Sequence, residues 1–98
     1  MAQTPEGKVK ARLKKQLDEL GIYHFSPYQA GMGRAGVPDV IGCYQGRFVA
    51  FEYKAGNNKP TALQEREMNA IRTAKGLAFV INEENVNQLK ELLQWTKN

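Results

Sequence analysis

Apolar residues near the start of the chain recur at helical spacing. Four of them would share one face of a helix: Val9, Leu13, Leu17 and Leu20. Thr4 can cap the start of this helix, and Pro5 suits its first turn. Gly21 would end it. We therefore predict an amphipathic helix that begins at the Thr4 cap and ends before Gly21.

The remaining pattern predicts four strands and two more helices. The strands are expected at residues 22–25, 39–44, 47–54 and 77–81, where strand-like apolar runs lie between turn residues. Thr61 and Gln64 fit a capping box that opens a second helix, which would end at Lys75-Gly76. Asn82 would cap a last helix whose inward side chains are Val86, Leu89, Leu92 and Leu93. This order predicts a single α/β domain over residues 1–98, with a mixed four-stranded sheet flanked by helices.

The composition of the 98-residue chain is ordinary for a soluble globular protein, with 42% apolar and 24% charged residues. No apolar run reaches the roughly 20 residues that cross a membrane, and the N-terminus has no hydrophobic signal region. We therefore expect a cytoplasmic protein without a membrane partner. Cys43 is the single cysteine, which excludes an intrachain disulfide and a cysteine-rich zinc site.

Positive charge is concentrated in the first helix, and the net charge of the chain is +4. Five basic residues fall close together: Lys8, Lys10, Arg12, Lys14 and Lys15. Such a surface attracts polyanions such as nucleic acid. The alternative is a solvated helix face with no partner.

Gln45 and Gly46 form a candidate two-residue turn between the second and third strands. With that turn, Tyr44 pairs with Arg47, and residues that pair have numbers that sum to 91. The same register places the residues at 39 and 52 opposite each other. A longer loop would shift the register and remove this pairing.

The register brings three charged residues together on one face of the sheet. Asp39 lies opposite Glu52, and Lys54 follows two residues further along the strand. The same face continues with residues that we expect to be buried: Ile41, Cys43, Phe48 and Ala50. Two opposed carboxylates repel each other, so the cost must be offset by a shared proton, by Lys54 as counter-ion or by a divalent metal. A metal would also activate water for phosphodiester cleavage. The alternative is an ion triad that only caps the edge of the sheet.

Three motifs together resemble a known family. Gly36-Val37-Pro38-Asp39 gives GxPD, Glu52 to Lys54 gives ExK, and Thr61 to Gln64 gives Thr-x-x-Gln, followed by Lys75-Gly76 before a strand. The set resembles the virus-type replication-repair nuclease (VRR-NUC) domain of the PD-(D/E)XK nuclease superfamily, over roughly residues 4–81. The resemblance implies a restriction-endonuclease-like αβββαβ core, to which this chain adds a C-terminal helix.

The resemblance also implies roles for individual residues. Asp39 and Glu52 would bind Mg²⁺ or Mn²⁺ together with the backbone carbonyl of Tyr53, and Lys54 would position or activate the attacking water. Gln64 would reach toward this site from the start of its helix.

Two of the implied roles have simpler alternatives. Glu6 matches a family acid that often helps to bind metal, although an acid in the first turn also stabilises a helix without any other role. Gln64 is equally explained as the capping partner of Thr61, and both roles can coexist.

The function implied is a DNA endonuclease of the replication and repair type, acting on branched DNA such as four-way junctions. Stand-alone members of the family look like phage proteins similar to Holliday-junction resolvases, which act as homodimers, so the cytoplasm would be that of the host cell. The alternatives are a flap- or nick-directed nuclease, or a non-catalytic DNA-binding protein that kept the fold. No organic cofactor is expected. Seven residues would attract the DNA backbone: Lys8, Lys10, Arg12, Lys14, Lys15, Arg34 and Lys59.

Other signals are weaker. Residues 31–36 match GxGxxG, but a dinucleotide-binding motif must open a helix, and here a strand follows. We interpret these glycines as a loop that lets DNA approach Asp39, with Arg34 on a phosphate, or else as simple loop flexibility.

His24 is expected to be structural, and Cys43 to be a buried small apolar residue. Candidate contacts for a dimer are Phe25, Tyr28, Met32 and Trp95, each of which also suits the core.

Overall fold

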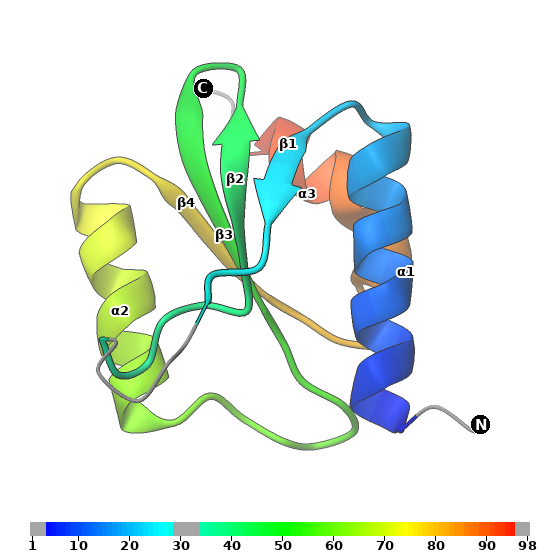
Figure 1. Ribbon diagram of the computed structural model, residues 1–98, viewed down its shortest axis with the longest axis horizontal. Coiled ribbons are helices and arrows are strands. Elements are labelled where there is room, and N and C mark those ends of the chain that lie inside the picture. The colour runs from blue at the N-terminus through cyan, green and yellow to red at the C-terminus, as the bar shows by residue number, and fades with distance from the viewer. Residues whose placement is uncertain (1–3, 29–33, 96–98) are drawn as a thin grey trace.

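The computed structural model describes residues 4–28 and 34–95 (Figure 1). In this part of the chain the elements follow the order α1 (Pro5–Glu19), β1 (Tyr23–Phe25), β2 (Val40–Tyr44), β3 (Arg47–Tyr53), α2 (Ala62–Thr73), β4 (Leu77–Ile81), the 3₁₀ helix η1 (Val86–Gln88) and α3 (Leu89–Trp95). This arrangement confirms the predicted α/β fold, with a mixed sheet flanked by helices and a C-terminal helix. No helix among the described residues is long and apolar enough to cross a membrane.

The four strands form one sheet in the order β1-β2-β3-β4. β1, β2 and β3 pair antiparallel, and β4 runs parallel to β3, with α2 as the crossover between them. Gln45 and Gly46 have φ angles of 51° and 83°, as a type I′ hairpin turn requires. Tyr44 therefore pairs with Arg47, which confirms the predicted register. The ladder ends at the pair Val40 and Phe51, so the strands are one residue shorter than predicted at this end.

Local chemistry fixes the ends of α1 and α2. The Thr4 hydroxyl accepts a hydrogen bond from the amide of Gly7, and Gly21 follows α1 with a φ of 70°. Thr61 and Gln64 form the predicted capping box at the start of α2. At the end of α2 the left-handed residue is Lys75, with a φ of 76°, and Gly76 then donates to the carbonyl of Ile71.

The last helix begins later than predicted. The side chain of Asn82 accepts hydrogen bonds from the amides of Glu84 and Asn85, so it stabilises a turn and caps no helix directly. η1 follows this turn, and α3 begins only at Leu89. Val86, Leu89 and Leu93 are buried and Leu92 packs against them, so the predicted inward face is confirmed.

The two faces of the sheet are covered unequally. α1 and α3 cover one face (Figure 1). Phe51 belongs to the buried cluster that includes leucines of both helices. α2 covers part of the other face, where Met68 packs on Ala50 and Ala78. A single helix therefore shields only the β3–β4 side of that face.

The unequal cover explains a wrong prediction. Cys43 and Phe48 lie on the predicted face, opposite each other, but both are exposed because α2 does not reach them. Tyr23 pairs with Cys43 on the other side. Tyr23, Cys43 and Phe48 thus form an exposed row across three strands, which we call the uncovered row. Among the predicted dimer contacts, Phe25 and Tyr28 are exposed. Met32 and the side chain of Trp95 lie outside the described structure.

Candidate functional site

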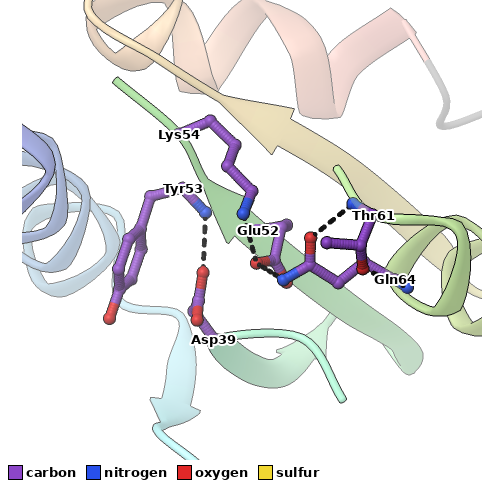
Figure 2. Close-up of polar contacts among 6 residues, drawn as sticks. All are labelled: Asp39, Glu52, Tyr53, Lys54, Thr61 and Gln64. Carbon is purple, nitrogen blue, oxygen red and sulfur yellow. Dashed lines mark hydrogen bonds and ion pairs between the residues drawn. The ribbon is translucent and has the colours of Figure 1, made fainter. Parts of the chain in front are cut away.

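Asp39 and Glu52 meet where β2 begins and β3 ends (Figure 2). The backbone amide of Tyr53 donates a hydrogen bond to Asp39 Oδ2 at 3.0 Å. The ladder of β2 and β3 ends at Val40 and Phe51, and beyond it the side chain of Asp39 accepts the hydrogen bond of the Tyr53 amide. β3 therefore holds the Asp39 carboxylate beside its own Glu52.

Glu52 is almost completely buried, with 1% of its surface exposed. Its Oε2 accepts a hydrogen bond from Gln64 Nε2 at 2.7 Å and lies 3.8 Å from the ammonium of Lys54. Its Oε1 is also buried but receives no hydrogen bond within the described structure. A buried carboxylate oxygen without a donor is costly, so this atom is poised to bind a proton or a cation.

The burial of Glu52 changes its acidity. Desolvation and the nearby Asp39 carboxylate raise the pKa of Glu52 from 4.5 to about 8, against the opposing effect of the Lys54 ammonium. In its neutral form Glu52 can share its proton with Asp39. A divalent cation would satisfy both carboxylates in place of that proton.

The donor set fits a hard divalent metal. Two carboxylates and a backbone carbonyl are oxygen ligands, and one carboxylate oxygen has no other partner. A third acid is missing, because no group of three His, Cys, Asp or Glu side chains in the described ranges is placed to hold a metal. Glu6 therefore does not complete a cluster with Asp39 and Glu52 in this arrangement, and its role in metal binding stays a prediction.

Glu6 instead lies near the aromatic side chain of Tyr53. Burial, then the carboxylates of Asp39, Glu6 and Glu52, raise the pKa of the Tyr53 phenol to about 12. Lys10 lies over the same ring, with its ammonium 6.0 Å from the ring centre. Two residues of α1, the acidic Glu6 and the basic Lys10, therefore lie near Tyr53 of β3, the strand that also carries Glu52.

Gln64 performs both of the roles considered from the sequence. Its Oε1 accepts from the amide of Thr61 at 2.8 Å, while its Nε2 donates to Glu52 (Figure 2). The capping box therefore fixes the side chain that satisfies Glu52 Oε2. Lys54 is held as well, since its side chain is 15% exposed and its amide donates to the carbonyl of Ile81.

The predicted DNA-binding residues lie in different local surroundings. Lys8, Arg12 and Lys15 line an open hollow of about 440 Å³ between α1 and the turn before α3, and Asn87 accepts from Arg12 in it. Lys10 lies instead over Tyr53, and Lys14 is half-buried. The basic side chains of α1 therefore project from more than one side of the helix.

Lys59 lines a second hollow, of about 670 Å³, next to the acids. Residues 56–60 line it together with Val80, Asn82 and Glu84. Val80 pairs with Glu52 on the adjacent strand, so this hollow adjoins the face of the sheet from which Glu52 and Lys54 project.

Arg34 forms an ion pair with Glu67 that the sequence analysis missed. Its Nε lies 2.9 Å from Glu67 Oε1. The available signal was that Glu67 follows Gln64 by three residues and so lies on the same face of α2. His24 is placed elsewhere, with its Nε2 2.7 Å from Asp18 near the end of α1.

A solved structure described as a VRR_NUC domain matches this arrangement. It has a TM-score of 0.75 and 28% sequence identity, and the match covers 91% of this chain and 97% of that one. No family sequence model and no curated protein sequence matches the chain. The fold and the paired acids define a nuclease-like α/β domain. The structural match supports a VRR-NUC domain over 91% of this chain.

Proposed function

We propose that the protein is a Mg²⁺- or Mn²⁺-dependent endonuclease that hydrolyses phosphodiester bonds in DNA. One observation carries this proposal: a buried carboxylate with an unsatisfied oxygen lies beside a second carboxylate and an ammonium. Pure binding of DNA would not need opposed acids at this position. The likeness to a VRR_NUC domain supports the same reaction class.

The metal would be held by Asp39, Glu52 and the backbone carbonyl of Tyr53, with Glu6 as a further candidate ligand. It would supply a polarised phosphoryl oxygen and a more acidic water. Gln64 keeps Glu52 oriented through Oε2, which leaves Oε1 available for binding.

Lys54 would position the attacking water and stabilise the negative charge that develops on the phosphoryl oxygens. Its ammonium lies 3.8 Å from Glu52 Oε2, which is longer than a direct charge-assisted hydrogen bond. The ammonium is therefore not committed to a short ion pair with Glu52. The water oxygen attacks phosphorus, the bond to one bridging oxygen breaks, and that oxygen leaves with a proton. Catalysis here is mainly positioning and charge stabilisation.

The substrate is proposed to be branched DNA, such as a four-way junction. Basic residues lie at separate places on the molecule, in α1, in the hollow lined by Lys59 and at Arg34, which suits DNA segments that diverge from one another. These contacts would attract the backbone without reading sequence.

The protein is further proposed to act as a homodimer. The uncovered row places aromatic side chains on an open sheet face, and Tyr23 alone is 69% exposed. A second copy would cover this face by two-fold symmetry and bring two sites to one junction.

The test is cleavage of an end-labelled four-way junction beside flap, nicked and linear duplexes, with Mg²⁺ or Mn²⁺. Paired symmetric cuts in the junction are expected. Cuts confined to one strand near a flap or nick would favour the flap- or nick-directed nuclease. Binding without cleavage under either metal ion would leave a DNA-binding protein and overturn the proposal.

A further inference from the structure

Glu67 is a buried carboxylate that the proposed cleavage does not use. It lies on the inward side of α2, and its side chain is 11% exposed. A carboxylate removed from water is stable only when it is paired or hydrogen-bonded. Its ion-pair partner is the guanidinium of Arg34, a residue that lies far from it in sequence.

Arg34 belongs to the segment that leads into Asp39, and this segment is docked on α2. Gly36 has a φ of 78°, and a Cβ atom there would lie 2.5 Å from the carbonyl oxygen of Leu63. Only glycine permits this close backbone approach. Pro38 is buried next to it. The segment is therefore fixed to the start of α2 by backbone packing and by the Arg34–Glu67 ion pair.

One helix thus holds both sides of the site. Gln64 contacts Glu52 of β3, and Glu67 holds Arg34 of the segment before β2. Three residues of α-helix rise by about 4.5 Å, so the two contacts lie roughly one turn apart along α2. The ion pair of Arg34 and the contact to Glu52 are therefore both made from one face of α2. The Arg34 side chain remains 73% exposed, so it faces solvent.

We infer that Glu67 is a positioning residue that holds Arg34 ready to bind a phosphate of DNA beside the cleaved bond. The inference rests on the proposed function. Because Glu67 engages Nε, the two terminal nitrogens of the guanidinium are left to face a phosphate. Fixing the long arginine side chain beforehand lowers the entropy that DNA binding must remove.

The experiment is a double-mutant cycle on the full chain, with Arg34→Ala, Glu67→Leu and the double variant. Cleavage of labelled branched DNA gives kcat and KM, and fluorescence anisotropy of the same DNA in EDTA gives Kd. Each single variant should raise KM and Kd about tenfold with kcat unchanged, and the double variant should be no worse than either single one. Glu67→Gln keeps an acceptor for Nε and should restore most of the affinity.

Two matched variants control for charge. Arg66→Ala and Glu65→Leu make the same kinds of change at exposed positions of α2 and should leave the coupling between Arg34 and Glu67 unchanged. A charge-swapped protein, Arg34→Glu with Glu67→Arg, tests pairing without emptying the buried position. It should keep the wild-type melting temperature and still lose DNA affinity.

Three results would overturn the inference. These are additive effects in the cycle, a lower melting temperature of Glu67→Gln with unchanged Kd, and tighter DNA binding when Glu67 is replaced. The last would mean that Glu67 withholds Arg34 from DNA. If the wild type never cleaves, the endonuclease proposal fails by itself, and the anisotropy cycle in EDTA still decides the role of Glu67.

Discussion

The amide of Tyr53 donates to the side chain of Asp39 at 3.0 Å, and this bond ties the residue before β2 to the end of β3. It lies just beyond the last backbone pair of the two strands, Val40 and Phe51. The two carboxylates of the site are therefore placed by the sheet itself. An amide side chain at this position could accept the same hydrogen bond, which separates the role of the charge from the role of the geometry.

Asp39→Asn should keep the fold and lose cleavage. The amide oxygen of the substituted side chain still accepts from Tyr53, but one negative charge of the metal site is gone. We expect cleavage to fall by at least about 100-fold. Loss of a residue that only hydrogen-bonds to a metal ligand costs up to about 100-fold, and Asp39 is proposed to be a ligand itself. Junction binding in EDTA should not weaken. The measurements are turnover with Mn²⁺ and calorimetric titration with Mn²⁺, and undiminished metal affinity would contradict the assignment.

Lys54→Ala should lower kcat by about 10²–10³-fold with little effect on DNA affinity, because its ammonium acts on charge that develops during the reaction. Lys90→Ala is a matched control, since Lys90 is an exposed lysine of α3. Single-turnover cleavage and anisotropy separate the two effects. Cleavage by Lys54→Ala at the rate of the control would remove Lys54 from the mechanism.

Stability without metal should fall as pH rises from about 4.5 to about 8. Burial and Asp39 raise the pKa of Glu52 to about 8, so the folded protein keeps a proton that the unfolded chain has already lost. Relative to Glu52→Gln, the wild type should lose on the order of 2–4 kcal/mol of unfolding free energy across this window. Urea unfolding at several pH values measures it.

Divalent metal supplies the control for this pH dependence, since it replaces the proton at Glu52 and should reverse the trend. Mg²⁺ or Mn²⁺ should raise the melting temperature of the wild type more at pH 8 than at pH 5.5, and should have little effect on Glu52→Gln. A metal effect that is independent of pH would show that the ion binds elsewhere.

Much of this arrangement could be predicted because it depends on local rules. The hairpin register follows from Gln45 and Gly46, which adopt the left-handed conformations of a tight turn, and from a period of two along each strand. Once the register is set, the position of Asp39 near Glu52 follows by counting. The capping box of Thr61 and Gln64 is equally local.

The errors concern contacts between distant segments. Cys43 has the right orientation for a buried residue, but its exposure depends on how far α2 extends over the sheet. The pair of Arg34 and Glu67 joins a loop to a helix, and no periodic pattern reports such a pair. Asp39 was predicted as the first residue of a strand, whereas β2 begins one residue later, at Val40.

Gln64→Ala should impair cleavage more than Thr61→Ala, although both remove the capping box. Each should cost about 1 kcal/mol of stability through the cap. Only Gln64→Ala also removes the donor to Glu52 Oε2, so its cleavage should fall a further 10- to 100-fold. Melting temperatures and initial rates of both variants decide the matter, and equal rates would reduce Gln64 to a capping residue.

Phe48→Glu should convert a dimer into monomers without unfolding the protein. Phe48 is 46% exposed in the uncovered row, so a monomer can place a charge there in contact with water. In the proposed dimer the same charge would be buried between two apolar faces, which is unfavourable. Dimer affinity should weaken at least about tenfold, and Gln94→Glu on α3 is a matched control. Sedimentation velocity gives the oligomeric state.

Cys43, which lies opposite Phe48, supplies a second readout of the same interface. Its thiol should react slowly with an alkylating reagent in the wild-type dimer and fast in Phe48→Glu. A wild type that sediments as a monomer with a fast-reacting thiol would rule out this face as the interface.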